Sequence, residues 1–434
     1  MQPMKNILIA IFSLLSASLA SAQTDIYIRG AGKLFPIALP QLCLQVGDSA
    51  ASREIPRIIA RDLELSGYFE VLNPGSYVET PGKCAGPDGF AYSDWSVIGA
   101  EGLVRGVITA TSQGTLTAQL YLHDVQKQRI VFGKEYEGDE SQVPRIAHKF
   151  ANEIMRFFTG KAGIFGTQIS FSSRIGRFKE IFVMDMDGSN VRQLTDEKSL
   201  ALSASWDRSG KSLIYTSYRR RMPDLFTLDI ASRRSRQITT GSDLEIGARF
   251  SHDGTKLLTS VSQSQDSDIV LINSQGQVVR RLTSQNGAID VSPDWSPDDS
   301  KVVFCSNRSG GPQIYVMDAS GANAHRISFV SSSYCTSPRW APEGDKIAFV
   351  CRADSGFQIF VTDPQGANPL QLTSVGDNED PDWSPDGRYL VFATTFGKRQ
   401  GFSLALMRSD GSNMKQLTSA RGGDYQPSWG PVIP

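Results

Sequence analysis

Short apolar runs alternate with polar turns from about residue 165 to residue 434, and the alternation repeats six times. One recurring phrase ends in Leu-Thr or a close variant, and its last residues are Thr195, Thr239, Thr283, Ser328, Thr373 and Thr418. The other begins with an aromatic residue before a turn rich in Pro, Asp and Gly, and it is headed by Trp206, Phe250, Trp295, Trp340, Trp383 and Trp429. Both recur every 43 to 46 residues, and each interval holds four short β-branched runs. The pattern predicts one four-stranded propeller blade per repeat, whereas a helical solenoid would need apolar stripes of period 3.6.

The two ends of the repeat array predict how the ring closes. The first repeat begins at Thr167 without an aromatic strand, and the last repeat consists of that strand alone, around Trp429. We therefore expect the C-terminal strand to complete the first blade and to leave no open innermost edge. Such a closure makes the propeller sensitive to C-terminal truncation.

A different pattern covers residues 23 to about 160. Two apolar series with helical spacing each end before a glycine: Ile55, Ile58, Ile59 and Leu63 before Gly67, and Val143, Ile146, Phe150, Ile154 and Phe157 before Gly160. The alternating run 116–122 should pair with 104–110, and 129–136 should extend this sheet. The predicted fold class is an α+β N-terminal domain, residues 23–162, followed by an all-β six-bladed propeller closed by the C-terminal strand, residues 163–434.

The first 22 residues have the features of a cleaved export signal. Lys5 precedes the apolar run 7–15, which is followed by Ala20-Ser21-Ala22, and we expect cleavage after Ala22 and export of the mature protein. The run is too short to anchor the chain in a bilayer, and Gln23 cannot carry a lipid as a cysteine would. The mature chain then starts with a strand-like segment, Asp25-Ile26-Tyr27-Ile28-Arg29-Gly30, which can dock on its own sheet or on a partner; the residues favour its own sheet.

Charge and cysteine content narrow the function classes. Lys and Arg number 44 against 45 Asp and Glu, so the overall charge favours neither nucleic acid nor membrane insertion, and partners must be recognised locally. Five cysteines leave at least one thiol unpaired. We expect Cys43 and Cys84 to pair, and Cys305, Cys335 and Cys351 to be small buried core residues.

No catalytic group, cofactor or metal site is predicted. The four histidines, His123, His148, His252 and His325, are scattered without ligand spacing. Gly401 to Ala405 approaches a nucleophile elbow but lacks its closing glycine. The carboxylates Asp377, Glu379, Asp380 and Asp382 could bind Ca²⁺, although solvated loop carboxylates are the commoner explanation. We expect the recurring tryptophans to pack in the core between blades, and a role in stacking against sugars is the less favoured alternative.

Binding is therefore expected at the loops that join the fourth strand of one blade to the first strand of the next. Strand order gathers these loops on one face, around the mouth of the channel. The predicted partner-binding residues of this rim are Leu244, Glu245, Gly247, Asp290, Val291, Ser292, Tyr334, Thr336, Glu379, Asp380 and Tyr425.

The combination of motifs resembles the TolB family of the bacterial Tol-Pal system. The resemblance is carried by Ile26-x-Ile28-x-Gly30 leading to Pro36-Ile37-Ala38, by Ile59-Ala60-x-Asp62-Leu63, by Ser66-Gly67-x-Phe69 and by the propeller that follows. It covers essentially the whole mature chain. The WSPDG-type repeats alone are weak, because they also occur in propellers of prolyl-oligopeptidase-like enzymes.

The resemblance implies two protein partners. The propeller rim would bind a Pal-like peptidoglycan-associated lipoprotein, and residues 25 to 30 would bind a TolA-like inner-membrane protein, in support of outer-membrane integrity and constriction at cell division. The alternatives are the propeller of a peptidase, a polysaccharide-active enzyme fragment, and a structural scaffold without a defined partner. A peptidase would need an α/β-hydrolase domain and a polysaccharide enzyme would need clustered channel residues, so both enzyme readings are disfavoured.

Overall fold

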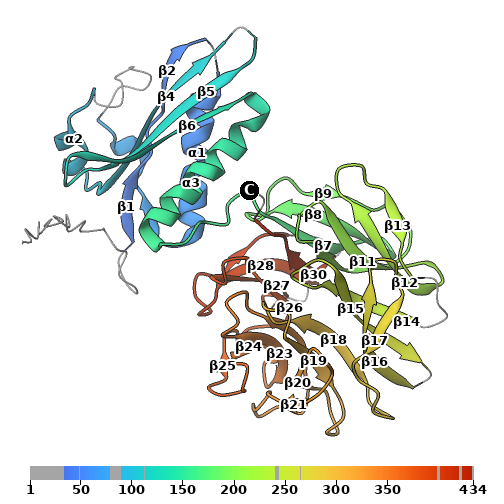
Figure 1. Ribbon diagram of the computed structural model, residues 1–434. Helices are drawn as coiled ribbons and strands as arrows, with labels where there is room; N and C mark the ends of the chain where they lie inside the picture. The colour runs from blue at the N-terminus through green and yellow to red at the C-terminus, as the bar shows by residue number, and fades with distance from the viewer. Residues whose placement is uncertain are drawn as a thin grey trace, which may run out of the picture.

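The structure is a computed structural model that describes residues 34–47, 49–78, 89–111, 113–239, 244–263, 265–397, 401–419 and 423–432. An N-terminal α+β unit lies against one side of a ring of six small sheets (Figure 1). The predicted signal sequence and the segment Asp25–Gly30 lie outside the described residues.

The N-terminal unit is one mixed sheet with two long helices. Its strands are β1 (Phe35–Ala38), β2 (Cys43–Val46), β3 (Phe69–Val71), β4 (Gly102–Ala110), β5 (Leu116–Asp124) and β6 (Arg129–Gly138). The order is β3-β1-β4-β5-β6, with β2 also paired to β4. Its helices are α1 (Ala51–Ser66), the short α2 (Tyr92–Val97) and α3 (Val143–Thr159), with single 3₁₀ turns at Pro74–Ser76 and Glu140–Gln142. The predicted pairing of 104–110 with 116–122 is confirmed, as is the extension by β6; α2 was not predicted.

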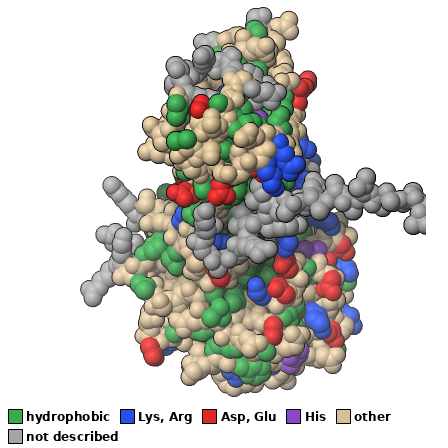
Figure 2. Space-filling model, turned by 90° about the vertical axis from the view of Figure 1, so that its left-hand side faces the viewer, with side chains coloured by type: hydrophobic (Ala, Val, Ile, Leu, Met, Phe, Trp, Pro, Cys, Tyr) green, Lys and Arg blue, Asp and Glu red, His purple; other side chains and the backbone are tan. Residues whose placement is uncertain are grey.

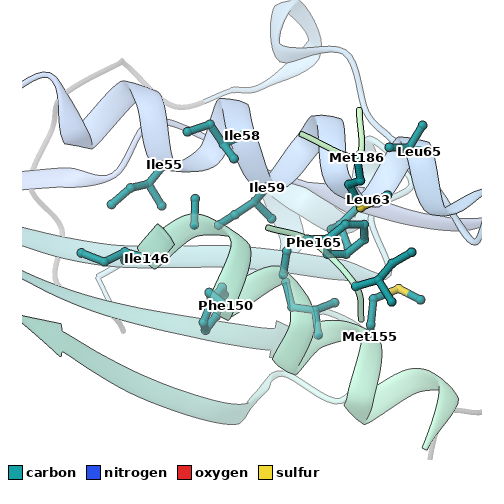
Figure 3. Close-up of a cluster of buried hydrophobic side chains, with 14 of the residues drawn as sticks. Ile55, Ile58, Ile59, Leu63, Leu65, Ile146, Phe150, Met155, Phe165 and Met186 are labelled. Carbon is teal, nitrogen blue, oxygen red and sulfur yellow. The ribbon is translucent and has the colours of Figure 1, made fainter. Parts of the chain in front are cut away.

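Both long helices end where the sequence indicates. Gly67 and Gly160 adopt left-handed backbone angles, with φ of 70° and 74°, and each closes its helix by a backbone hydrogen bond. Helices α1 and α3 pack together through their apolar stripes, and this core continues through Phe165 of the linker to Met186 of the propeller (Figure 3). The two units thus share one hydrophobic core.

The propeller has six four-stranded antiparallel blades, as predicted. Blade 1 is β30 (Asp424–Trp429), β7 (Gln168–Ile175), β8 (Phe178–Asp185) and β9 (Arg192–Gln193). Blade 2 is β10 (Ala201–Trp206), β11 (Ser212–Arg220), β12 (Met222–Asp229) and β13 (Ser235–Gln237). Blade 3 is β14 (Leu244–Phe250), β15 (Lys256–Gln263), β16 (Asp266–Asn273) and β17 (Val278–Arg281).

The remaining blades repeat this plan. Blade 4 is β18 (Asp290–Trp295), β19 (Lys301–Ser306), β20 (Gln313–Asp318) and β21 (His325–Arg326). Blade 5 is β22 (Cys335–Trp340), β23 (Ile347–Ala353), β24 (Gly356–Thr362) and β25 (Leu370–Gln371). Blade 6 is β26 (Asn378–Trp383), β27 (Tyr389–Thr394), β28 (Ser403–Arg408) and β29 (Lys415–Gln416).

Ring closure follows the prediction from the ends of the array. Strand β30 is the innermost strand of blade 1, with Asp424 opposite Ser173 and Trp429 opposite Ile169. The Trp429 indole donates to Thr167 Oγ1 over 2.9 Å. The last described strand therefore belongs to the first blade.

The Leu-Thr phrase has a structural cause. In every blade its hydroxyl accepts the backbone N–H of a buried apolar residue in the third strand; the donors are Ile181, Leu225, Ile269, Ile314, Ile359 and Leu404, at 2.9 to 3.0 Å. The fourth strands are only two to four residues long, so they pair few backbone groups themselves. The hydroxyl satisfies a buried donor that would otherwise be unpaired.

The tryptophans at the ends of the innermost strands are largely buried wedges between blades. Trp206 donates its indole N–H to the Ser428 carbonyl of blade 1 over 2.9 Å, and Trp383 donates to the Arg339 carbonyl of blade 5 over 3.1 Å. Each bond crosses from one blade to its neighbour. The prediction that these residues pack the core is confirmed.

Strand direction gives the propeller two unlike faces. We call the face that carries the 1–2 and 3–4 turns the turn face, and the face that carries the 2–3 hairpins and the fourth-to-first connections the rim face. The N-terminal unit docks on the turn face: Tyr389 Oη donates to Ser66 O over 2.8 Å, and Lys415 Nζ lies 3.2 Å from Glu64 O. Helix α1 has no basic residue in its last turn, so propeller side chains supply the donors for its C-terminal carbonyls.

The cysteines depart from the prediction. Cys335 and Cys351 form a disulfide, whereas we predicted small buried thiols. They lie directly opposite each other on β22 and β23, a register that their separation of 16 residues does not reveal. Cys305 is free and buried, and burial raises the pKa of its thiol to about 11. Cys43 is disulfide-bonded, while its predicted partner Cys84 lies outside the described residues.

Candidate functional site

The predicted rim residues lie on innermost strands more than in loops. Gly247 belongs to β14, Asp290 to Ser292 to β18, Glu379 and Asp380 to β26, and Tyr425 to β30. Leu244 and Glu245 begin β14, Thr336 lies on β22, and Tyr334 alone precedes its strand. The prediction that these segments are loops is therefore wrong for all but Tyr334, because each innermost strand starts closer to the rim face than the turn residues suggest.

Each innermost strand carries one left-handed residue at the same place. The six residues have φ between 51° and 62° and are Ser203, Gly247, Ser292, Ser337, Asp380 and Gln426. The pairing with the second strand shifts register at these points, so each is a β-bulge. The bulges turn the rim half of every innermost strand, and all six residues line a cavity of about 240 Å³ at the rim end of the channel.

Arg249 and Arg339 line this cavity, and the carboxylates next to them belong to a second cavity further along the channel. Asp382 lies between two cations, with Oδ2 3.8 Å from Arg249 Nη1 and Oδ1 3.7 Å from Arg339 Nε. Asp382 of blade 6 also accepts a hydrogen bond from the backbone N–H of Trp429 in blade 1, over 2.8 Å. A second carboxylate, Asp294 of blade 4, accepts one from the backbone N–H of Trp340 in blade 5, also over 2.8 Å. Burial raises the pKa of Asp294 and lowers that of Arg339. These charges thus form a fixed ionic layer between blades.

The acidic side of the cavity wall is at blade 6. Burial raises the pKa of Glu379 to about 7, with further contributions from the charges of Asp380 and Asp377. Asp380 accepts a hydrogen bond from the Ser337 hydroxyl over 3.2 Å, and burial raises its pKa as well. On the adjoining blade, Lys179 Nζ lies 3.9 Å from the ring centre of Tyr425. A partner approaching here would meet a carboxyl group that titrates near neutral pH.

Two other predicted residues have structural partners. The buried Asp290 accepts from Arg308 over 2.8 Å, which fixes it within blade 4. Tyr334 packs edge to face with Phe357 at 5.7 Å between ring centres, yet 41% of it remains exposed. Of these two residues, only Tyr334 is available to a partner.

Exposed apolar side chains surround the mouth of the cavity, and sequence reasoning did not single most of them out. They sit in or next to the five fourth-to-first connections between blades 1 and 6, and they are Leu200, Ile246, Ile289, Phe329, Tyr334 and Val375, from 37% to 66% exposed. Their signal in the sequence is a large apolar residue among polar ones; Phe329 and Tyr334 share one connection, and Ile246 lies on β14. An apolar ring with polar surroundings is typical of a protein-binding surface.

Rim carboxylates already accept hydrogen bonds from the propeller itself. Asp377 accepts a hydrogen bond from the Phe357 backbone N–H over 3.0 Å. Asp382 accepts one from the Trp429 backbone N–H. Within the described ranges no three His, Cys, Asp or Glu side chains gather as metal ligands would. Ser403 of the elbow-like sequence opens strand β28 and has no histidine as a hydrogen-bond partner.

None of the helices in the described part of the chain is both long and apolar enough to cross a bilayer.

Comparisons with known proteins agree with the architecture. Residues 155–433 match the family model described as the TolB β-propeller domain, and residues 25–131 match the TolB amino-terminal domain. The Tol-Pal system protein TolB of Anaeromyxobacter dehalogenans strain 2CP-C is 33% identical over 282 residues, which are 64% of each chain. A TolB homolog of Chlorobium chlorochromatii is 36% identical over 63% of this chain and 62% of its own length. The crystal structure of TolB from Acinetobacter baumannii superposes with a TM-score of 0.78 at 25% identity, over 92% of this chain and 97% of that one.

Proposed function

Because the chain belongs to the TolB family of Tol-Pal system proteins, we propose that it bridges two envelope proteins from the periplasm without catalysing a reaction. In this proposal the rim face binds a Pal-like lipoprotein, and the segment Asp25–Gly30 binds a TolA-like inner-membrane protein. Residues 1–22 would be removed on export, and residues 23–162 and 163–434 would form the two domains. The bridge would support outer-membrane integrity and constriction during cell division.

One observation carries the rim assignment: an apolar ring surrounds a charged cavity on the face that the N-terminal unit leaves open. Leu200, Ile289 and Val375 stand on separate blades, so a partner that covers the mouth contacts several blades at once. Asp380 lines the cavity and its neighbour Glu379 precedes it on β26, so this side of the rim offers carboxyl groups for hydrogen bonds to a partner. Apolar contact with a few fixed polar groups is how compact protein interfaces combine affinity with specificity.

The sharpest test of the rim is binding of a purified Pal-like lipoprotein, lacking its lipid, to rim variants. Tyr334→Ala removes an exposed aromatic ring, and Val375→Asp places a charge in the apolar ring. Each should weaken binding by about 10-fold or more, because interface centres depend on a few large side chains. Val278→Asp is the matched control, since Val278 is 62% exposed on the outer strand β17. Equal binding by all three variants would place the Pal-like partner elsewhere.

The second partner is tested by deletion of residues 23–30. The purified deletion protein should fail to capture a TolA-like protein while it keeps the thermal unfolding of the full mature chain. Loss of folding would instead assign these residues a structural role, and unchanged capture would move the TolA-like site to another surface.

A further inference from the structure

Blade 2 differs from the other blades in charge. Residues 197–239 contain nine Lys and Arg and four Asp and Glu, although the whole chain has a net charge of −1. Blade 5, residues 329–373, contains three Lys and Arg and four Asp and Glu on the same strand plan. The two blades lie on opposite sides of the ring (Figure 1). On the side nearer blade 5, acidic and basic side chains are interspersed over the propeller (Figure 2).

Six exposed arginines account for this charge, and we call them the arginine stripe: Arg219, Arg220, Arg221, Arg233, Arg234 and Arg236. The first three form the tip of the β11–β12 hairpin, the next two lie in the 3–4 turn, and Arg236 is on β13. The hairpin arginines reach across the blade to its outer strand. Arg219 Nη1 lies 3.0 Å from Ser235 Oγ, and Arg220 Nη1 lies 2.6 Å from Gln237 Oε1.

Nearby carboxylates neutralise little of the stripe. Glu197 pairs with Arg219 over 3.0 Å, and Asp229 is occupied by the backbone N–H and hydroxyl of Ser232. Asp224 is buried beneath the blade surface. Within the described ranges, the five other arginines have no ion-pair partner. Their charge is therefore directed to solvent.

Protection of a sheet edge explains only one of these residues. Edge strands commonly carry a cation that discourages pairing with another chain. Arg192 on β9, Arg280 on β17 and Lys415 on β29 fit that purpose, and Arg236 of β13 has the same place. The hairpin tip and the 3–4 turn lie off that edge, so their five arginines need another explanation.

Exposed apolar side chains accompany the arginines. Met222 follows Arg221 at the hairpin tip and is 47% exposed. The corresponding tip of blade 1 has Ile175, 43% exposed, between Arg174 and Arg177. Cations that flank a projecting apolar residue are typical of surfaces that adhere to a bilayer, with guanidinium groups at the phosphates and the apolar residue at the acyl boundary.

We propose that the arginine stripe, with Met222 and Ile175, is a peripheral docking surface for an anionic phospholipid bilayer. The planar guanidinium group matches a phosphate with two hydrogen bonds, which favours arginine over lysine for this ligand. The stripe extends over the outer part of blade 2, from the 2–3 hairpin on the rim face to the 3–4 turn on the turn face, so it fits an extended anionic surface better than a single peptide. The proposal does not depend on the Pal-like or TolA-like partners, because the purified chain alone should bind.

The test is co-sedimentation of the mature protein with vesicles of phosphatidylcholine alone or with 30% phosphatidylglycerol added, at about 50 and 300 mM salt. Wild-type protein should bind only the anionic vesicles, and more weakly at high salt. The variant R220Q/R221Q/R234Q/R236Q should bind about 600-fold more weakly, because each of the four basic residues near an anionic surface contributes about fivefold. The matched control K256Q/K301Q/K346Q/R352Q removes four exposed cations from blades 3 to 5 and should lose far less.

A second pair of variants examines the apolar part. Met222→Asp should weaken binding to the anionic vesicles relative to wild type. Leu370→Asp should not, because Leu370 is 53% exposed on the outer strand of blade 5, away from the stripe. Thermal unfolding identifies any variant that fails to fold. The proposal is overturned if wild-type protein does not bind anionic vesicles, or if the stripe and control variants lose equal affinity. It is also overturned if the protein binds soluble polyglutamate but not anionic vesicles, which would indicate an acidic protein partner.

Discussion

The turn face and the rim face are built from the same six repeats, yet they differ in regularity. On the turn face the 1–2 turns are capped by their own side chains, as where Asp386 accepts from the Ser384 hydroxyl over 2.6 Å, and this face holds the N-terminal unit. On the rim face the fourth-to-first connections differ in length and sequence, and they expose an apolar ring. Repetition therefore serves folding and domain docking on one face, while divergence provides binding on the other.

The largest effect should come from removal of β30, on which both faces depend. Deleting residues 424–434 removes the innermost strand of blade 1 and the buried Trp429, and exposes the edge of β7. We expect loss of cooperative unfolding and an aggregation-prone product, since an unpaired central edge is a template for association. Circular dichroism and calorimetry of the truncated protein measure this; a native-like unfolding transition would contradict a closed ring.

The next effect should be confined to the rim side of blade 5. Cys335→Ser with Cys351→Ser removes a link across 16 residues, which should lower the free energy of unfolding by about 3 kcal/mol. Urea unfolding measures the loss. Cys305→Ser is the control, because this thiol is unpaired and its removal should cost less. If the double variant were as stable as wild type, the disulfide would not support the rim.

On the turn face, Arg388 holds the N-terminal unit. Its guanidinium group lies 2.9 Å from Ala162 O, 3.2 Å from Thr159 Oγ1 and 2.6 Å from Asp386 Oδ2. Arg388→Ala should cost about 2 kcal/mol and speed proteolytic cleavage between the two units, because half-buried acceptors lose their donor. Arg326→Ala on the outer strand of blade 4 is the control. Equal cleavage rates would mean that the shared apolar core alone holds the units together.

The smallest expected effect is a pH dependence at the rim. In the folded protein the pKa of Glu379 is about 7 against a usual 4.5, so folding becomes less favourable as pH rises between these values. Glu379→Gln should therefore raise Tm at pH 8 by about 1 to 3 °C and change it little at pH 4.5, a small shift because solvent screens this half-buried group. A gain of the same size at both pH values would show that its ionisation is not responsible.

The sequence predicted the fold more completely than the site. Repeat spacing, the incomplete first repeat and the isolated strand around Trp429 were enough for the blade count and the closure, because these are local patterns. The β-bulges were missed because non-glycine residues such as Ser292 and Gln426 adopt left-handed angles there, without a turn motif. The Cys335–Cys351 disulfide was missed because it depends on the register between two strands.

The site, too, was only partly predictable from the sequence. Gathering of the connections on one face follows from strand order, so the location of the rim was predictable, whereas the buried position of Asp290 was not. The docking of α1 carbonyls on Lys415 and Tyr389 joins residues more than 300 positions apart, and nothing local in the sequence signals it. Contacts between distant segments are set by the packed fold and not by neighbouring residues.

The pairing of β30 with β7 also sets an order of events in folding. Ser173 must wait for Asp424, so blade 1 remains incomplete while the roughly 250 residues between them are synthesised. Throughout that interval the growing chain is an unfinished array whose apolar wedges face water. A chaperone that shields exposed strands should therefore raise the folding yield of this chain more than that of a protein in which strands paired in space are also adjacent in sequence.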